Sequence, residues 1–399
     1  MSKKIKPEVE TFARIKVVGI GGSGGNAINH MISNKVKGVD FIAVNTDAQD
    51  LHHSAAKKKI HIGKNLTKGL GTGMNPEMGR RAADETKEEL QEALKNSDMV
   101  FIACGEGGGT GTGAAPIVAK TAREIGALTV GVVTKPFFFE GSQRMKLAVQ
   151  GLENLSKEVD ALIVIPNDRI LQNVEKETSA TEAFGMADEV LKEAVEGISD
   201  LITTPGIINV DFADIRAIME NAGSALMGVG KADGDNRAIE AAKGAINSPL
   251  LDLSINGAKG VLFAIAGSDD MTMHEIQEAA KVITESIDPD AKVIFGAIKD
   301  DRLKKNEVKV TVIASGFPEN QVIRAAGGDS GSLFQFGRDT GTEDEEKDER
   351  DEKDEKPKKK KDGEPTRHMR NERNSDDEAG DDDDDWGAVP AFLRRSKLK

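Results

Sequence analysis

Residues 107–113 read GGGTGTG, and this segment constrains the fold more than any other part of the chain. It follows an apolar run at 98–103 and precedes a helix expected to begin near Ala114. Glycine loses more backbone freedom on ordering than any other residue, so an ordered loop of this composition needs a compensating interaction. Backbone N–H groups at the start of a helix can hold phosphate, and the two threonines add hydroxyl groups. The segment therefore indicates a phosphate-binding turn between a strand and a helix.

Two further glycine-rich turns have a similar setting. Residues 19–26 (GIGGSGGN) follow an apolar run, and residues 69–76 (GLGTGMNP) precede a helix expected to reach Leu94. In the second turn, Asn75 suits an N-cap and Pro76 suits the first helical position. The chain contains no G-x-x-x-x-G-K-[ST] sequence, and the GGGTGTG segment holds no lysine, which argues against a Walker-type NTPase.

Apolar runs rich in branched residues alternate with helix-like segments in the first half of the chain. The expected strands are 14–20, 41–45, 98–103, 127–133 and 159–165. Their near-continuous apolar character predicts strands that are covered on both faces, as in a parallel sheet. Ligands of such sheets bind at the carboxyl ends of the strands, where two of the three glycine-rich turns are placed.

A long helix and a second group of strands follow. Apolar residues at helical spacing predict one amphipathic helix over 178–203, about 39 Å long. The later expected elements are strands at 259–266, 292–298 and 307–315 and helices near 235–246 and 271–286. The sequence therefore predicts an α/β fold with a Rossmann-like parallel-sheet domain, a long central helix and a second, smaller α/β domain.

Charge sets the C-terminal part of the chain apart. Residues 343–385 contain 21 Asp or Glu and 11 Lys or Arg, and no Val, Ile, Leu, Phe, Trp or Cys. Such a segment has too little apolar surface to bury, so it is expected to be a disordered linker. Apolar and basic residues return in the last segment, 386–399 (WGAVPAFLRRSKLK).

Composition argues against several functional classes. The net charge of −14 has the wrong sign for a chain that binds nucleic acid through its phosphates. The single cysteine, Cys104, excludes an internal disulfide and a zinc site built on several cysteines. No apolar run approaches the roughly 20 residues of a membrane span, and the first residues lack the apolar segment of a signal peptide. A cytoplasmic protein without direct membrane insertion is expected.

The first glycine-rich turn also permits a different hypothesis. Gly19, Gly21 and Gly24 satisfy the dinucleotide-binding fingerprint, and Asp47 follows the next strand, where a ribose-binding acid could lie. A nicotinamide-dependent oxidoreductase is therefore the alternative, although it leaves GGGTGTG unexplained and the chain has no tyrosine to serve as a proton donor. A third possibility is a non-catalytic, nucleotide-dependent adaptor.

Taken together, the glycine-rich turns resemble those of the tubulin/FtsZ superfamily of GTPases, and in particular its bacterial cell-division members. GGGTGTG is the most specific segment, and NTDAQ (45–49), FEG (139–141), PNDR (166–169) and NVDFADIR (209–216) agree with it. The similarity extends over about 14–317. The family usually has GGGGNN in its first turn, where this chain has Ser23 and Gly25 in place of a Gly and an Asn.

The resemblance implies a GTP or GDP site with Mg²⁺ as the counter-ion of the phosphates. Its residues would be Gly22, Ser23, Gly24, Gly25, Asn26, Gly71, Thr72, Gly73, Gly107, Gly108, Gly109, Thr110, Gly111, Thr112, Glu140, Arg144, Asn167, Phe184 and Asp188. The glycine-rich turns would face the phosphates, and Glu140 and Arg144 the ribose and the neighbouring phosphate. Phe184 would stack on the base, while Asn26 and Asp188 would bond its edge. An Asp that accepts from the N1–H of guanine would reject adenine, whose N1 is itself an acceptor.

Asp211 and Asp214 lie three residues apart at the start of an expected helix, and on sequence alone they are helix-capping acids. The resemblance assigns them, with Asn209, a second role. They would reach the γ-phosphate bound to a neighbouring subunit and position the attacking water. Hydrolysis would then require subunits stacked head to tail, a contact that does not close on itself and therefore generates a filament.

The resemblance also divides the chain and gives its end a role. The segments would be a flexible N-terminus (1–13), a nucleotide-binding α/β domain (14–177), the central helix (178–204), a second α/β domain (205–318), a disordered charged linker (319–385) and a docking peptide (386–399). The peptide's anchors would be Trp386, Val389, Pro390, Phe392 and Leu393. Its expected partners are membrane-tethering and regulatory division proteins, which would place the protein at the mid-cell division ring.

Overall fold

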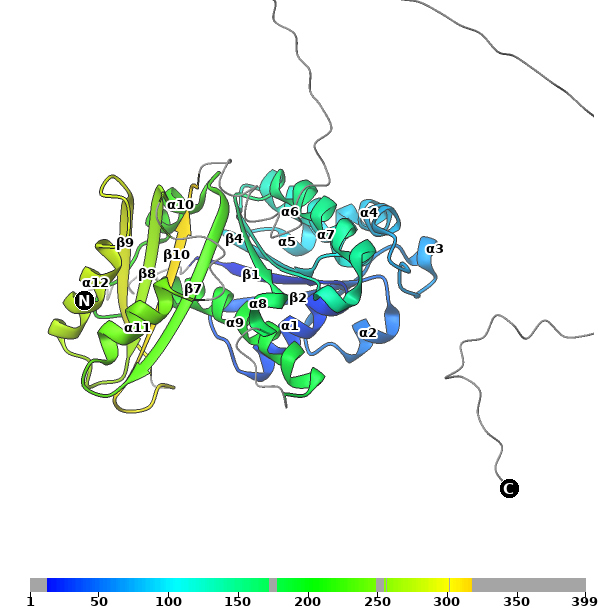
Figure 1. Cartoon of the computed structure of the whole chain (residues 1–399). Helices are drawn as coiled ribbons and strands as arrows, with labels where there is room; N and C mark the ends of the chain where they lie inside the picture. Colours follow the sequence, from blue (N-terminus) through cyan, green and yellow to red (C-terminus); the bar gives the residue numbers. More distant parts are fainter. Residues whose placement is uncertain (1–12, 172–177, 249–254, 256, 301, 318–399) are drawn as a thin grey trace, which may run out of the picture. The chain divides into compact units, whose positions relative to one another are not determined.

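One ten-stranded sheet runs through the computed structural model, several strands of which are labelled in Figure 1. The strand order is β3-β2-β1-β4-β5-β6-β7-β10-β8-β9. The strands are β1 (Ile15–Ile20), β2 (Val39–Asn45), β3 (Lys58–His61), β4 (Met99–Gly105), β5 (Leu128–Lys135), β6 (Ala161–Pro166), β7 (Gly223–Asp233), β8 (Gly260–Gly267), β9 (Lys292–Lys299) and β10 (Glu307–Ser315). The structure describes residues 13–171, 178–248, 255, 257–300 and 302–317, all of which belong to the first of two compact units, Met1–Leu333.

Parallel pairing dominates this sheet. All pairs from β3 to β7 are parallel, as is β8 with β9, whereas β10 is antiparallel to both of its neighbours. The pairing of β6 with β7 covers only three residue pairs, beginning at Ala161 and Gly223. The mixed α/β fold with a smaller second domain is confirmed. The second domain is joined to the first by strand pairing as well as by the long helix.

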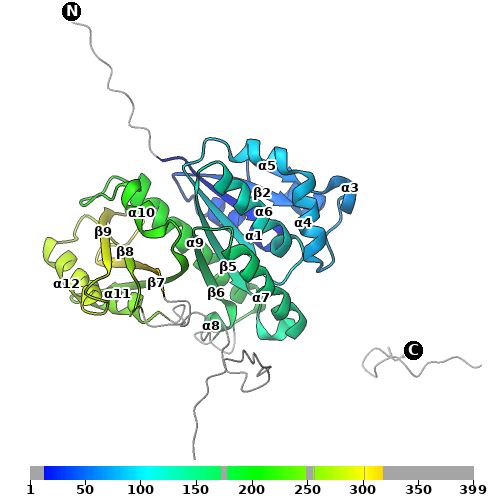
Figure 2. The same ribbon diagram turned by 90° about the horizontal axis from the view of Figure 1, so that it is seen from above.

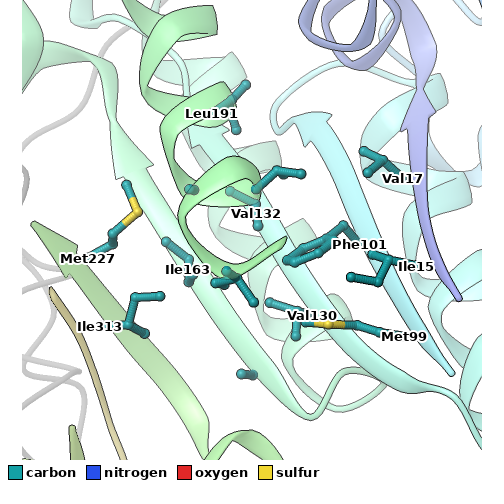
Figure 3. Close-up of a cluster of buried hydrophobic side chains, with 14 of the residues drawn as sticks. Ile15, Val17, Met99, Phe101, Val130, Val132, Ile163, Leu191, Met227 and Ile313 are labelled. Carbon is teal, nitrogen blue, oxygen red and sulfur yellow. The ribbon is translucent and has the colours of Figure 1, made fainter. Parts of the chain in front are cut away.

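The strands of the first domain are buried on both faces, as their apolar runs predict. On β4, Met99 and Phe101 face one hydrophobic cluster, and Val100 and Ile102 face another. The first of these clusters continues across the sheet to Ile313 of β10 (Figure 3). Because one core includes strands of both domains, the carboxyl ends of the parallel strands are held in place relative to the second domain.

The long helix α9 (Ala180–Thr203) lies along that shared cluster, to which Leu191 and Ile198 contribute (Figures 2 and 3). Ser179 is its N-cap and forms a capping box with Glu182, a pairing that satisfies two backbone donors at the helix start. Its 24 residues span about 36 Å. The helix therefore reaches from one end of the parallel sheet to the other.

Helices flank the second group of strands. α11 (Arg237–Ile246) and α12 (Met273–Thr284) cover one face, where alternate β8 residues such as Phe263 join a third cluster. α10 (Phe212–Met219) and α9 lie over the other face, together with Leu262 of β8. The first domain holds α1 (Gly21–Ser33), α2 (Ala48–His53), α3 (Lys64–Thr67), α4 (Pro76–Glu85), α5 (Lys87–Leu94), α6 (Thr110–Glu124), η1 (Phe138–Glu140), α7 (Ser142–Ser156) and α8 (Asn167–Leu171).

Several sequence-based expectations for individual elements were wrong. β3 and β7 were not predicted, because β3 is short and lysine-rich and β7 contains three glycines. The helix expected to reach Leu94 divides at Thr86, whose backbone leaves the helical region (φ −112°, ψ 17°). α6 starts at Thr110, four residues before the expected start. Part of the glycine-rich segment is therefore the first turn of a helix.

The predicted linker (319–385) and docking peptide (386–399), with Trp386 and its neighbouring anchors, lie outside the described residues, as do residues 1–12. Among the helices of the described part, none combines the length and the apolar character needed to cross a membrane.

Candidate nucleotide site

A cavity of about 510 Å³ opens at the carboxyl edge of the parallel strands. It is bounded by the residues that end β1, β4 and β5 or follow them, which is where open α/β sheets bind ligands. Its lining is Ile20, Gly21, Gly22, Ser23, Asn26, Thr72, Gly105, Glu106, Gly108, Gly109, Thr110, Gly111, Thr134, Pro136, Glu140, Arg144, Asn167, Phe184, Ala187 and Asp188. Thirteen of the nineteen predicted nucleotide-binding residues belong to this lining.

Two helices begin at this cavity. α1 starts at Gly21 and α6 at Thr110, and neither helix has a side-chain hydrogen bond at its N-cap or an acidic residue in its first turn. The two starts touch, since a β-carbon on Gly21 would lie 3.0 Å from the backbone nitrogen of Gly111. Their first N–H groups and the positive ends of two helix dipoles thus converge on one space. Such an arrangement favours an anion with several oxygens, as phosphate groups have.

Three buried hydroxyls join the glycine-rich turns. Thr110 lies 2.7 Å (Oγ1 to Oγ1) from Thr46 and 3.3 Å from Thr72. Thr46 is fully buried at the end of β2 and was not singled out in the sequence. Its only sequence signal was its place in the NTDAQ segment. These contacts fix the turn at Thr72 against the start of α6.

The far end of the cavity combines an aromatic ring with a carboxyl group on α9. Phe184 is 46% exposed and meets the buried ring of Phe137 edge-on, with 5.1 Å between ring centroids. Phe184 is therefore held against Phe137, while its exposed side lines the cavity. Burial raises the pKa of Asp188 to about 6, which His30 offsets only in part. Asn26 also lines the cavity.

Polar groups form a third side of the cavity. Glu140 and Arg144 form an ion pair, and Glu140 also accepts a hydrogen bond of 2.9 Å from the N–H of Phe137. Asn167 is only 6% exposed, and within the part of the chain that the structure describes its Oδ1 has no hydrogen-bond partner. An unsatisfied buried acceptor in a cavity wall indicates that a ligand donor or water completes it.

Six predicted phosphate-binding residues lie outside this lining: Gly24, Gly25, Gly71, Gly73, Gly107 and Thr112. Gly24 packs against the backbone of β4, and Gly107 has a left-handed conformation (φ +90°) beside Arg144. The hydroxyl of Thr112 accepts a hydrogen bond of 2.9 Å from the N–H of Gly107. The structure thus gives three of these residues a role in shaping the turns. Their contact with phosphate remains a prediction.

Glu106 is a lining residue that the sequence reasoning missed. It is 4% exposed, and its Oε2 has no hydrogen-bond partner among the residues that the structure describes. Burial raises its pKa to about 7, and hydrogen bonding by Thr112 and Cys104 counteracts only part of that rise. The available signal was an acid placed directly between an apolar strand and the GGGTGTG segment.

The predicted catalytic residues lie elsewhere, around the start of α10. Asp211 is its N-cap and accepts from the N–H of Ala213 at 3.1 Å, as expected from its position. Asn209 accepts from the N–H of Gly206 at 2.6 Å. Asn209, Asp211 and Asp214 are all exposed, and none lines the cavity.

α10 lies at the amino edge of the parallel strands. Arg216, two residues after Asp214, donates to the carbonyl groups of Asp98 and Gly126, which precede β4 and β5. The cavity described above lies at the opposite, carboxyl edge of these strands. Along α9, the distance from Asp188 to Thr203 is roughly 23 Å. The acids therefore do not share a site with the cavity of their own subunit.

Asp47, the ribose-binding acid of the alternative hypothesis, caps α2 instead. Its carboxylate accepts from the N–H groups of Gln49 (2.9 Å) and Asp50 (3.2 Å), and it does not line the cavity. The oxidoreductase hypothesis therefore lacks the contact between an acidic side chain and the ribose that a dinucleotide-binding fingerprint requires. Within the described ranges, no group of three or more His, Cys, Asp or Glu side chains could hold a metal ion.

Comparison with protein-family models gives two matches. Residues 14–175 match the GTPase domain of the Tubulin/FtsZ family, and residues 223–318 match the C-terminal domain of the FtsZ family. The first matched range contains most of the cavity lining, and the second contains the second group of strands; Phe184, Ala187 and Asp188 of α9 lie between the two.

Solved structures with the same fold include a protein titled "FtsZ dimer, empty" from M. jannaschii. It is 49% identical, with a TM-score of 0.74 over 77% of this chain and 89% of that one. Two proteins of Haloferax volcanii share the fold at lower identity. CetZ2, titled as a GTPγS-bound protofilament, is 22% identical with a TM-score of 0.67 over 78% of this chain and 96% of that one. CetZ1, titled as a GDP-bound monomer, is 23% identical with a TM-score of 0.64 over 78% of this chain and 98% of that one.

The M. jannaschii protein is archaeal, so the comparisons do not support the expected bacterial assignment.

Proposed function

The chain belongs to the tubulin/FtsZ family of GTPases, and on that premise we propose that it binds and hydrolyses GTP while polymerising head to tail into filaments. The observation that carries the proposal is the position of the two acids. Asp211 and Asp214 lie at the edge of the sheet opposite the cavity, so a second subunit is needed to bring such acids to a bound nucleotide.

GTP and GDP are the proposed ligands of the cavity. The polyphosphate binds between the starts of α1 and α6, where N–H groups without side-chain caps converge. The base stacks on the free side of Phe184, and its N1–H and exocyclic amine donate to Asp188. Glu140 and Arg144 hold the ribose side, and Asn167 accepts a hydrogen bond from the ligand.

Mg²⁺ accompanies the phosphates in this proposal. It usually retains several waters and binds through substrate phosphates, with few protein ligands. The N–H groups of the turns can bind phosphate oxygens, and the hydroxyl groups of Thr72 and Thr110 lie in the same cavity wall. The ion would therefore enter together with the nucleotide. Bound there, Mg²⁺ would supply positive charge that offsets the charge of the phosphates.

Hydrolysis is proposed to be completed across the subunit contact. Asn209, Asp211 and Asp214 of one subunit approach the γ-phosphate held by the next, and the carboxylates orient and polarise the attacking water. Such a contact joins two different surfaces of the same chain. It repeats without closing and produces a filament.

The filament is proposed to scaffold the cell-division ring from the cytoplasm. The terminal peptide, with Trp386, Val389, Pro390, Phe392 and Leu393, binds membrane-tethering and regulatory division proteins. The charged segment before it is a tether that raises the peptide's effective concentration at the filament. The family membership and the second, FtsZ-type domain support this cellular role.

One experiment tests the activity and the role of the acids together. Light scattering and phosphate release are followed after GTP and Mg²⁺ are added to the wild-type protein and to Asp214→Ala. The wild type is expected to assemble above a threshold protein concentration and to hydrolyse GTP as it does so. Asp214→Ala is expected to bind GTP with little change while its turnover falls at least 100-fold.

Two outcomes would contradict the proposal. Near wild-type turnover in Asp214→Ala would exclude hydrolysis by the acid pair. Tight binding of a nicotinamide dinucleotide without any response to GTP would instead favour the oxidoreductase. Asp235→Ala, an exposed acid in the turn before α11, serves as the control and is expected to behave as wild type.

A further inference from the structure

Glu106 is a buried carboxyl group in the wall of the phosphate cavity. Its side chain lies between α6 and α7, because a β-carbon on Gly151 of α7 would collide with both Oε2 of Glu106 and the methyl group of Thr112. Its backbone N–H donates to the carbonyl of Thr134 at 2.9 Å, which fixes the residue at the end of the sheet. The carboxyl group is thus enclosed directly behind the GGGTGTG segment.

The surroundings do not favour a charged carboxylate. Cys104 of β4 is a titratable side chain that contacts Glu106, with its Sγ 3.6 Å from Oε1. Burial raises the pKa of the Cys104 thiol well above its usual value, so that it stays neutral. Arg144 of α7 lies nearby against Gly107, but it is paired with Glu140 of η1. Among the described residues, no charged side chain contributes to the pKa of Glu106.

A bound polyphosphate would add several negative charges beside this group. A like charge disfavours the ionised form of a carboxyl group, and burial reduces the screening between the two. Thr112 connects the two sites, since its hydroxyl accepts from the N–H of Gly107 within the turn and its methyl group lies with the Glu106 carboxyl group against Gly151. An ionised Glu106 and a filled phosphate site therefore oppose each other.

We propose that Glu106 makes nucleotide binding proton-linked: the polyphosphate binds the subunit in which the Glu106 carboxyl is protonated, and binding takes up one proton from solvent. The inference rests on the proposed function, because it assumes that the cavity receives a nucleotide. In the empty protein the carboxyl is about half ionised near neutral pH. Nucleotide affinity then falls as pH rises above 7, by up to tenfold per pH unit.

The test measures GDP and GTPγS binding by isothermal titration calorimetry between pH 6.5 and 8.5, in two buffers of different ionisation enthalpy. Wild-type protein is expected to take up close to one proton per nucleotide at pH 8 and to bind five- to tenfold more weakly at pH 8.5 than at pH 7.5. Glu106→Gln, which is permanently neutral, is expected to lose both effects and to bind at least as tightly as wild type at pH 8.5.

Glu193→Gln is the control, because Glu193 is also buried but is paired with Lys231 outside the cavity. It is expected to keep the wild-type pH dependence. The same pH dependence in Glu106→Gln would overturn the inference alone. Wild-type binding without buffer-dependent heat at pH 8 would also overturn it, and that measurement needs no variant. Failure of the wild type to bind guanine nucleotides at any pH would overturn the proposed function and this inference with it.

Discussion

Gly24 of α1 packs against the carbonyl oxygen of Ala103 in β4 at a spacing that leaves no room for a β-carbon. A β-carbon on Gly24 would lie well under 3.0 Å from that oxygen, a distance that real side chains essentially never show. This glycine therefore lets the first helix settle onto the sheet. Its neighbours, Gly21 to Ser23, are thereby brought to the cavity.

Gly24→Ala is predicted to destabilise the first domain by about 1–3 kcal/mol, because the new methyl group must displace backbone atoms of β4. Nucleotide affinity should fall as well, since α1 can no longer lie at its present depth. Gly25→Ala is the matched control. Its β-carbon would meet only Oδ2 of Asp50, at 3.8 Å, and alanine favours a helix, so stability should be unchanged or higher. Chemical denaturation of both variants checks this, and equal losses would contradict the packing argument.

Asp188→Asn is predicted to exchange guanine for xanthine specificity. The carboxylate accepts two donors from guanine, whereas an amide presents one donor that matches the 2-oxo group of xanthine. GTP affinity should fall by roughly ten- to a hundredfold, the usual range for a lost charge-assisted hydrogen bond, and XTP should become the better ligand. Competition binding measures this. Glu189→Gln, whose carboxylate is paired with His30 and Lys192, should leave the preference for GTP unchanged.

Acidification is predicted to weaken GTP binding through Asp188. Burial raises the pKa of this carboxyl to about 6, and only the ionised form accepts both donors of guanine. The contribution of Asp188 to affinity should therefore be fully present above pH 7 and be lost as pH decreases through 6. Binding of guanosine itself, which carries no phosphate, isolates this effect from the phosphate site. A flat profile for guanosine between pH 7 and 5 would contradict the assignment of Asp188 to the base.

Two inactive variants are predicted to restore hydrolysis when mixed. Asp214→Ala keeps its nucleotide cavity, and Asp188→Asn keeps its acid pair at the opposite edge of the sheet. In filaments formed from an equal, random mixture, up to about one quarter of the head-to-tail contacts join the cavity of an Asp214→Ala subunit to the acid pair of an Asp188→Asn subunit. Phosphate release from GTP should then exceed the sum of the two variants measured separately. Strict additivity would mean that each subunit completes its own site.

Arg302→Met is predicted to weaken the attachment of α9 to the second group of strands. Arg302 pairs with Glu196 and Asp200 of α9 and with Asp300, all of which are buried. Removing the guanidinium leaves buried carboxylates without their main partner, and we expect a loss of about 2–3 kcal/mol because Arg302 itself is half-exposed. Arg80→Met removes a comparable but exposed set of ion pairs on α4 and should have little effect on thermal unfolding.

The sequence by itself determined the elements whose signals are local. Continuous apolar runs identified β1, β4 and β5, and helical periodicity identified α9 to within two residues at its start. The GGGTGTG segment predicted a phosphate-binding turn, because its composition is costly to order without an anion, and the structure places Gly108 to Gly111 in the cavity wall. β7 was missed because three glycines dilute its apolar pattern, and it becomes a strand through pairing with β6 and β10.

Only the tertiary structure decided which residues meet. No local pattern distinguishes Gly24, which faces β4, from Gly22, which faces the cavity, because that difference arises from the packing of α1 on the sheet. Burial, which sets the protonation of Glu106, likewise comes from α6 and α7 closing over it. The separation of Asp211 and Asp214 from the cavity follows from the length and direction of α9. Sequence specifies local conformation and chemistry, whereas distance and solvent exclusion depend on how distant segments pack.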